Sequence, residues 1–228
     1  EIVGKIDRVD IMNNEKEQYI RIIDYKSSIK DIDLNEVKAG IKLQLLTYMN
    51  EMCKQESAEP AGAFYYNLIE PMVKASQNMS DEQIEEELRK QFKMRGLILA
   101  DVDIIRKMDK NLDTGSSNII PATINKDETL SKKASNISKQ QFEYLQKYTN
   151  KIIKQISEEI LSGNINIKPY YNTKNKKTPC EYCTYKSICQ FGNGICKKEY
   201  NYISNLEKEA KDFLELLSNK NLFNKETV

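Results

Sequence analysis

Two Ile- and Val-rich segments near the N-terminus, residues 2–12 and 18–27, restrict the possible folds more than any other feature of this chain. Each has the length and composition of a β-strand. The polar stretch NNEKE separates them and has the character of a turn. The sequence therefore predicts an antiparallel hairpin with a slightly long loop.

Helix and strand signals alternate after this hairpin. Asp33 followed by Glu36 is a helix start signal. Apolar residues then recur at helical spacing and predict one helix: Val37, Ile41, Leu45, Tyr48, Met49 and Met52. A Pro-Ala-Gly break at 60–62 precedes a predicted buried strand at 63–71. The order strand, strand, helix, strand indicates the α/β class.

The remaining elements are mostly helical. Ser80 with Gln83 begins a helix that ends before Gly96. Residues 115–133 are polar and without periodicity, so they predict a loop or a weak hairpin.

The longest predicted helix begins at Ser138, with Gln141 in the capping position, and closes at Gly163. One apolar stripe runs along it, and core packing explains that stripe: Phe142, Leu145, Tyr148, Ile152, Ile156 and Ile160. A Lys-rich connector and a Cys-rich segment follow. The last predicted element is an amphipathic helix from about Tyr200 to Leu217.

Composition limits the class of protein. The chain has 228 residues, 39% apolar and 30% charged, which fits one globular core with a small annex. Its 35 Lys and Arg residues nearly balance 34 Asp and Glu residues, so any basic surface is local. No apolar run reaches about 18 residues and no signal peptide is present, so we expect a cytoplasmic protein without membrane contact. The chain begins at Glu1 without Met, and we interpret it as a fragment.

The absence of histidine excludes several kinds of site. Ser-His-Asp and Cys-His catalysis both need an imidazole, as do many zinc sites. Any chemistry within this chain must therefore come from carboxylates, Lys, Tyr or Cys.

An acid and a base occur together in the second predicted strand. Because side chains alternate along a strand, Asp24 and Lys26 point to the same face. Asp7 on the partner strand supplies a second carboxylate, and two carboxylates in a partly buried site repel unless a cation lies between them. The pattern outlines a Mg²⁺ or Mn²⁺ site that hydrolyses phosphodiesters, in which Lys26 holds a water or neutralises charge.

Two further residues are candidates for this site. Gln44 and Tyr48 are one helical turn apart and would orient the water or a phosphate. The alternative is that Asp24 and Lys26 form only a solvated ion pair, since this spacing is common in exposed strands. Asp10 has the opposite strand parity to Asp7 and is expected to be a structural or solvent residue.

Three motifs follow one another along the chain: Gly4 with Asp7, then Asp24 to Lys26, then Gln44 to Tyr48. This ordered set resembles the motifs of the PD-(D/E)XK nucleases of the RecB branch. The resemblance implies a restriction-endonuclease-like α/β fold, with a mixed central sheet flanked by helices and a C-terminal helical annex that carries cysteines. It assigns metal binding to Asp7, Asp24 and the Tyr25 carbonyl, and catalysis to Lys26. Gln44 and Tyr48 complete the site.

The resemblance extends along most of the chain. Residues 95–105, 161–171 and 178–191 are similar to the C-terminal nuclease domains of AddB-type subunits of ATP-dependent helicase/deoxyribonucleases. This implies a nuclease core at 1–165 with helical insertions, and a Cys-rich segment with a terminal helix at 166–228. It also implies a DNA exonuclease in double-strand-break repair, with an AddA-type helicase-nuclease subunit as partner.

Four of the five cysteines lie near the C-terminus. Cys180, Cys183 and Cys189 have a spacing that suits zinc or an iron-sulfur cluster, and Cys196 would complete a zinc site. The resemblance instead implies a [4Fe-4S] cluster on the first three, with a fourth ligand upstream of residue 1, so that the cluster is absent from this fragment. Cys196 is then incidental, and Cys53 is expected to be a core residue.

Lys and Tyr alternate through residues 168–186, KPYYNTKNKKTPCEYCTYK. This composition suits sequence-independent contact with single-stranded DNA, but it equally suits a solubilising loop. Two rival functions also remain open. One is an inactive nuclease fold that binds DNA or a second protein of the same complex, and the other is a metal-stapled interaction module.

Overall fold

The computed structural model describes residues 3–14, 17–69, 72, 79–131, 135–191, 199–203 and 212–215. The chain forms two compact units. The first unit comprises Glu1–Ile32 and Lys42–Thr149, and the second comprises Asp33–Ile41 and Asn150–Val228. Each unit is described by itself.

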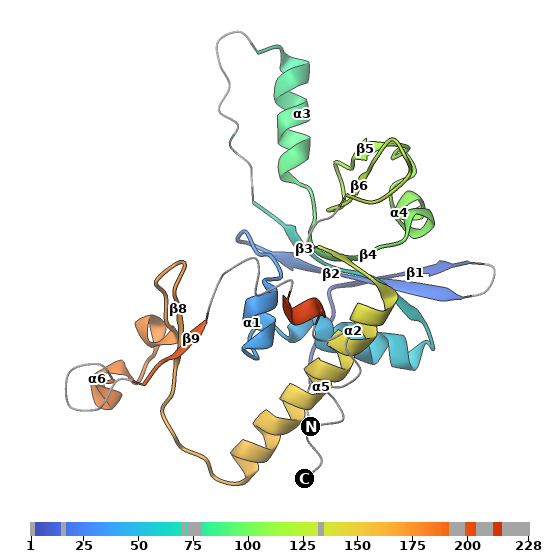
Figure 1. The fold of residues 1–228 in the computed structure, drawn as a ribbon. Helices are drawn as coiled ribbons and strands as arrows, with labels where there is room; N and C mark the ends of the chain where they lie inside the picture. Colours follow the sequence, from blue (N-terminus) through green and yellow to red (C-terminus); the bar gives the residue numbers. More distant parts are fainter. Residues whose placement is uncertain are drawn as a thin grey trace. The chain divides into compact units, whose positions relative to one another are not determined.

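A mixed five-stranded sheet forms the centre of the first unit (Figure 1). The spatial order of its strands is β1 (Arg8–Asn13), β2 (Gln18–Lys26), β3 (Glu59–Asn67), β4 (Arg95–Leu99) and β7 (Asn136–Ile137). Strands β1 and β2 are antiparallel, β2 and β3 parallel, β3 and β4 antiparallel, and β4 and β7 parallel. The expected α/β fold with a mixed sheet is confirmed.

Helices cover both faces of this sheet (Figure 1). Helix α2 (Gln44–Gln55) lies against β2 and β3, and its Asn50 donates a hydrogen bond to the Gln146 carbonyl of α5 (Lys139–Leu161). Helix α4 (Val102–Met108) and the short pair β5 (Gly115–Ser116) and β6 (Thr123–Ile124) lie on the other face. Helix α3 (Asp81–Gln91) extends away from the sheet and buries no residue.

The alternation of side chains along β2 divides the core between the two faces. Ile23 joins a buried cluster on the α4 side with the following residues: Phe64, Met94, Ile98, Ile105, Leu112, Ile120, Ala122 and Ile124. Ile20 and Ile22 have no exposed surface and point to the α2 side, where Leu45 and Met49 are also fully buried. The sheet is therefore covered on both sides, as its apolar strands require.

Several helix starts predicted from the sequence are confirmed. Ser80 and Gln83 form a reciprocal capping box at the start of α3. At α5, the Gln141 amide donates to Ser138 Oγ and the Ser138 amide donates to the Gln141 side chain. The polar stretch 115–133 contains the weak hairpin that was one of its two expected forms.

The boundaries of two predicted strands are wrong. Strand β1 begins at Arg8 rather than at residue 2, within the described residues. Strand β3 begins at Glu59 and includes the Pro-Ala-Gly segment that predicted a break. Pro60 is tolerated because it lies near the start of the strand, where the register of β2 against β3 shifts between Ile20 and Arg21.

The prediction of a single helix after Asp33 is also wrong, because the structure has two helices in this part of the chain. Helix α1 (Leu34–Lys38) is capped by the Asp33 side chain, and α2 begins at Gln44. Between them, Gly40 and Lys42 have φ angles of +77° and +56°. A backbone in this left-handed region cannot continue a right-handed helix.

The second unit contains α1, the C-terminal part of α5 and several short elements. These are β8 (Tyr170–Asn172), which pairs in parallel with β9 (Asn201–Ile203), the 3-10 helix η1 (Pro179–Tyr182) and α6 (Lys186–Cys189). The predicted terminal helix does not begin at Tyr200, since 201–203 is a strand. Residues 212–215 are helical, and the rest of that prediction lies outside the described residues.

The apolar stripe of α5 is buried only at its N-terminal end. Phe142 and Leu145 have no exposed surface, whereas Ile156 and Ile160 are 44% and 70% exposed. Core packing therefore explains the first half of the stripe and not the second. The periodicity was correct, but amphipathic spacing alone does not say how far along a helix its neighbours extend.

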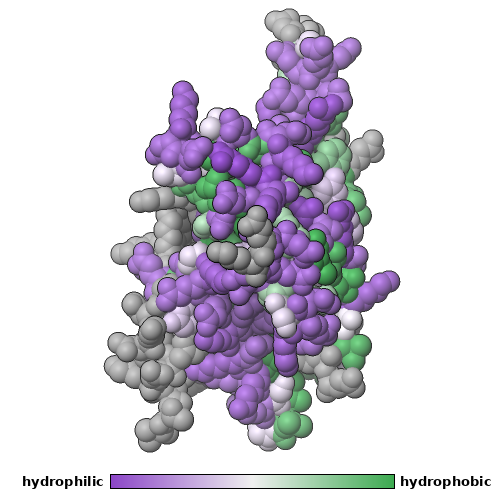
Figure 2. Space-filling model, turned by 90° about the vertical axis from the view of Figure 1, so that its right-hand side faces the viewer, coloured by the Kyte–Doolittle hydropathy of each residue, from purple (hydrophilic) through white to green (hydrophobic). Residues whose placement is uncertain are grey.

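The surface seen in Figure 2 is mainly hydrophilic, with apolar side chains in separate areas. In the part of the chain that the structure describes, no helix combines the length and the apolar character that crossing a membrane would require.

Candidate functional site

The end of strand β2 carries a buried carboxylate beside an ammonium group. Asp24 is 3% exposed, and its Oδ2 lies 2.5 Å from Nζ of Lys26. Both side chains point to the α2 side of the sheet, like Ile22, because residues two apart in a strand share a face. Tyr25 points to the opposite side and is 36% exposed.

Asp7 reaches the same end of β2 from the neighbouring segment. It directly precedes β1, in which Arg8 pairs with Ile23. Asp7 Oδ2 accepts a hydrogen bond of 3.0 Å from the backbone amide of Tyr25. The amide and the carbonyl of one residue point to the same edge of a strand, so the Tyr25 carbonyl also faces the edge where Asp7 lies. The structure thus brings Asp7 next to the Asp24–Lys26 segment.

Helix α2 adds two polar side chains to this group. Gln44 is its first residue, and Gln44 Oε1 lies 3.5 Å from Lys26 Nζ as an acceptor. Gln44 Nε2 donates to the Tyr48 hydroxyl at 3.1 Å. The five residues that the sequence singled out, Asp7, Asp24, Lys26, Gln44 and Tyr48, therefore surround one end of β2 in the first unit.

A close approach to Tyr48 explains why this motif has a glycine at position 4. A Cβ atom placed on Gly4 would lie 2.8 Å from both Cε1 and the hydroxyl oxygen of Tyr48. Atoms this close overlap, so the backbone at Gly4 passes against the Tyr48 ring with no room for a side chain. The close approach links the segment before β1 to helix α2.

Tyr65 belongs to this site and was missed from the sequence. It lies opposite Asp24 in the parallel β2–β3 register, is 4% exposed, and has its ring centroid 5.8 Å from Lys26 Nζ. The ring limits solvent access on one side of the lysine and is attracted to its charge. The strand containing Tyr65 was predicted, but its register against β2 depends on the fold, so the sequence held no signal for this contact.

The donor set fits a hard divalent cation. Asp24 Oδ2 is buried and accepts no hydrogen bond from the described residues, so its charge is balanced there only by Lys26. Asp7, Asp24 and the Tyr25 carbonyl offer oxygen atoms, which Mg²⁺ and Mn²⁺ prefer. The described part of the chain has no group of three His, Cys, Asp or Glu side chains that would hold a metal alone. Water and substrate oxygens would have to complete the shell.

Asp10 lies on the other face of the hairpin. It receives hydrogen bonds from Nε of Arg8 at 2.8 Å and from Nε of Arg21 at 2.7 Å. Burial alone would raise the pKa of Asp10, but the bonds from the two arginines outweigh it and lower this pKa. The carboxylate therefore stays ionised and holds both guanidinium groups in place.

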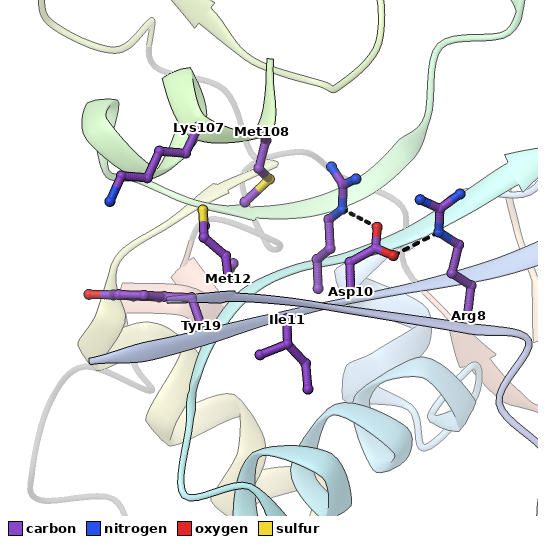
Figure 3. Close-up of a pocket in the computed structure, with 9 residues that line it drawn as sticks. Arg8, Asp10, Ile11, Met12, Tyr19, Lys107 and Met108 are labelled. Carbon is purple, nitrogen blue, oxygen red and sulfur yellow. Dashed lines mark hydrogen bonds and ion pairs between the residues drawn. The ribbon is translucent and has the colours of Figure 1, made fainter. Parts of the chain in front are cut away.

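Asp10 also lines a cavity of about 290 Å³ on that face (Figure 3). Its lining residues are Arg8, Asp10, Ile11, Met12, Tyr19, Arg21, Ala61, Lys107 and Met108. None of the five residues grouped at the end of β2 lines it. The cavity is therefore distinct from the Asp24–Lys26 site.

The described cysteines do not form a metal site. Cys180 and Cys189 are partly exposed, Cys183 is exposed, and all three are free thiols. Because no three metal-ligating side chains gather among the described residues, the spacing of these cysteines does not by itself bring them to one centre. Cys196 lies outside the described residues.

Cys53 is buried on α2, as expected for a core residue. Burial, with a contribution from the charge of Glu59, raises the pKa of its thiol to about 11. The thiol therefore stays protonated at neutral pH and acts as a small apolar side chain.

Comparisons with known proteins show a family match and several similar proteins. The family model described as "PD-(D/E)XK nuclease superfamily" matches residues 1–190. A relative from Thermoanaerobacter sp. (strain X514), which is named as a subunit of an ATP-dependent helicase/deoxyribonuclease, is 42% identical over 91% of this chain. Proteins of the same name from Bacillus thuringiensis (strain Al Hakam) and Acetivibrio thermocellus are 41% and 42% identical over 91% and 83% of this chain.

The chain spans only 17% to 18% of the length of these relatives. The family match, in contrast, covers most of the chain itself and includes every residue grouped at the end of β2. The chain belongs to the PD-(D/E)XK nuclease superfamily.

Proposed function

We propose that this chain is a metal-dependent DNA exonuclease module of an AddAB-type helicase-nuclease that acts in double-strand-break repair and recombination. The observation that carries the proposal is the convergence of Asp7, Asp24 and Lys26 at the end of β2, with Gln44 beside Lys26. Family membership makes a nuclease the expected activity, and the relatives' name specifies deoxyribonuclease.

The metal would be held by Asp7, Asp24 and the Tyr25 carbonyl. When bound, Mg²⁺ or Mn²⁺ supplies an activated water and stabilises negative charge on the phosphate. Asp24 is suited to this role because, among the described residues, only Lys26 balances the charge of its buried Oδ2. Asp7 is anchored through Tyr25, so its carboxylate is oriented before any substrate arrives.

Lys26 would neutralise charge that develops on the scissile phosphate and hold the attacking water. Its Nζ lies between Asp24 and Gln44, and its side chain is 30% exposed, so it can reach a substrate. Gln44 is in turn held by the Tyr48 hydroxyl. This hydrogen-bonded series fixes the position of the ammonium group, which matters because electrostatic stabilisation depends on preorganised charges.

The remaining parts of the proposal concern partners and a second cofactor. An AddA-type protein would be the helicase partner, and both would work in the cytoplasm, where DNA is processed. Cys180, Cys183 and Cys189 would hold a [4Fe-4S] cluster together with a ligand from elsewhere in a longer protein. Three partly or fully exposed thiols in one short segment support this, since they remain accessible to an outside ligand.

Residues 168–186 would contact the DNA without reading its sequence. Tyr182 and Tyr185 are 78% and 68% exposed, which leaves their rings available for stacking. Lys174 and Lys176 are also exposed, as phosphate contacts require.

Linear and circular DNA test the exonuclease proposal directly. With Mg²⁺ present, the chain should degrade end-labelled linear single-stranded DNA and leave a circular single strand of the same sequence intact, because an exonuclease needs an end. Gel analysis over time measures both. Equal cleavage of the circle would indicate an endonuclease, and no cleavage of either substrate would favour the inactive, binding-only alternative.

Gly4→Ala should lower the rate of DNA cleavage by about 10-fold to 100-fold, the range in which small misplacements act. The new methyl group would displace the Tyr48 ring and so loosen Gln44 and Lys26. Tyr48 is only partly buried, so stability should change by less than about 1 kcal/mol. Thermal melting and single-turnover cleavage measure the two effects. A wild-type cleavage rate would mean that Tyr48 does not position the site.

A further inference from the structure

Three aromatic side chains form a continuous row on the α4 side of the sheet. The Tyr25 and Tyr66 rings meet edge to face with centroids 5.9 Å apart, and the Tyr66 and Phe92 rings stack at 6.4 Å. They come from β2, β3 and the C-terminal end of α3. We call Tyr25, Tyr66 and Phe92 the aromatic row.

The aromatic row is open to solvent at both ends. Tyr25 and Phe92 are 36% and 37% exposed, whereas Tyr66 packs against the buried cluster around Phe64. The row therefore combines a fixed base with exposed aromatic surface, which is the form of a stacking platform.

The position of the aromatic row relates it to the proposed nuclease site. Tyr25 lies between Asp24 and Lys26 in sequence and points to the opposite face. Strand β2 ends at Lys26, so beyond this residue β2 no longer separates the two faces of the sheet. A DNA strand with one phosphate at Asp24 and Lys26 can therefore pass over the end of β2 and place a neighbouring base on Tyr25.

Positive charge lies beside the aromatic row. Arg8 Nε donates a hydrogen bond of 2.8 Å to Asp10. Arg8 lies opposite Ile23 in the β1–β2 register, so its side chain and that of Tyr25 are diagonal neighbours on the same face of the sheet. Its side chain is 49% exposed. Asp10 accepts hydrogen bonds from Nε of both Arg8 and Arg21, which fixes the orientation of the two guanidinium groups. The terminal nitrogens of each guanidinium group therefore point away from Asp10.

The cavity beyond Arg8 continues this charge (Figure 3). Its described lining has three cations, Arg8, Arg21 and Lys107, and one carboxylate, Asp10. Lys107 reaches it from α4 and donates a hydrogen bond of 2.7 Å to Asn14. An anionic ligand complements this excess of positive charge, and preoriented guanidinium groups are well suited to phosphate.

We propose that single-stranded DNA binds along this face, with bases stacked on the aromatic row and backbone phosphates held by Arg8 and the cations of the adjoining cavity. Stacking requires unpaired bases, and every base offers a ring face, so the surface selects single strands without reading sequence. The inference rests on the proposed nuclease function, because that function places the scissile phosphate at Asp24 and Lys26.

Phe92→Leu tests the stacking part. The substitution keeps an apolar side chain and removes the ring, so affinity for an oligo(dT) that contains 2-aminopurine should fall about tenfold, the scale of one lost base–aromatic stack. Binding is measured in the full chain with EDTA, so that no hydrolysis occurs, and stacking appears as quenching of 2-aminopurine fluorescence. Ile160→Ala is the matched control, since Ile160 is 70% exposed and belongs neither to the aromatic row nor to the lining of the cavity.

Arg8→Gln tests the phosphate part. Asp10 keeps its bond from Arg21, so the fold should be retained, which a thermal melt checks. The plot of log affinity against log salt concentration should become less steep by about 0.7, the contribution of one phosphate contact on a single strand. An unchanged slope would remove Arg8 from the binding surface.

The outcomes separate this inference from the nuclease proposal. If Phe92→Leu binds and quenches like Ile160→Ala, the stacking proposal is wrong, even when linear DNA is degraded normally. If the chain cleaves no DNA but the Phe92→Leu and Arg8→Gln effects appear, the binding surface stands and the exonuclease proposal fails.

Discussion

Replacing Asp24 by asparagine should lower Mg²⁺-dependent degradation of linear single-stranded DNA by about a thousandfold, the upper end of the range for losing one preorganised electrostatic group. Asparagine has nearly the same shape, so packing around this buried position is retained. It lacks the negative charge, however, and leaves Asp7 as the only carboxylate among the ligands proposed for the metal. The rate is measured at saturating DNA, so that weaker binding does not contribute.

Asp113→Asn is the control for this experiment. Asp113 belongs to the same unit, its side chain is 93% exposed, and it lies far down the chain from the grouped residues. This variant should cleave at the wild-type rate. If Asp24→Asn also cleaves at that rate, Asp24 has no part in the chemistry, and the two carboxylates are structural.

Lys26→Met should lower cleavage by about a hundredfold or more while Mg²⁺ binding persists. Methionine keeps much of the length of the side chain but cannot neutralise charge on a phosphate. Without Lys26, the carboxylate of Asp24 loses the ammonium that lies 2.5 Å away. The metal-free protein should therefore be less stable by about 1–3 kcal/mol, the cost of an unsatisfied buried polar group, and added Mg²⁺ should restore this loss.

The Mg²⁺-induced shift in melting temperature distinguishes the roles of the two residues. The shift should be larger for Lys26→Met than for the wild type, because the metal no longer competes with an ammonium for Asp24. It should be small or absent for Asp24→Asn. A Lys26→Met protein that loses both cleavage and the Mg²⁺ response would show that Lys26 supports the metal site itself instead of acting on the phosphate.

These two variants also address the rival interpretations of the chain. An inactive nuclease fold would show no cleavage in the wild type and no difference among the variants, although DNA binding would remain. A metal-stapled interaction module predicts that stability depends on the cysteine segment and is unaffected at Asp24. Asp24 and Cys183 belong to different compact units, so a substitution at one site can be compared with a substitution at the other.

Local signals in the sequence determined the parts of the fold that depend on short-range physics. The capping boxes at Ser80 and Ser138 formed as expected, because a cap involves only residues within one helical turn. The shared face of Asp24 and Lys26 follows from strand alternation alone. The motif order by itself likewise indicates the nuclease family, and the family match confirms it.

Long-range packing decided the rest. Three features depend on which neighbours surround each segment. They are the inclusion of Pro60 in β3, the break at Gly40, and the exposed end of the α5 stripe at Ile156 and Ile160. Short segments carry too little information to specify those neighbours.

The candidate site likewise depends partly on the local sequence and partly on the tertiary structure. The residues predicted from the sequence were Asp7, Asp24, Lys26, Gln44 and Tyr48. The contact of Gly4 with Tyr48 and the position of Tyr65 beside Lys26 were found only in the tertiary structure. The aromatic row also depends on it, since Tyr25, Tyr66 and Phe92 meet only through the β2–β3 pairing and the chain's return after α3. Sequence alternation fixes which side of its own strand a residue occupies, whereas the register between distant strands is set by the packing of the whole core.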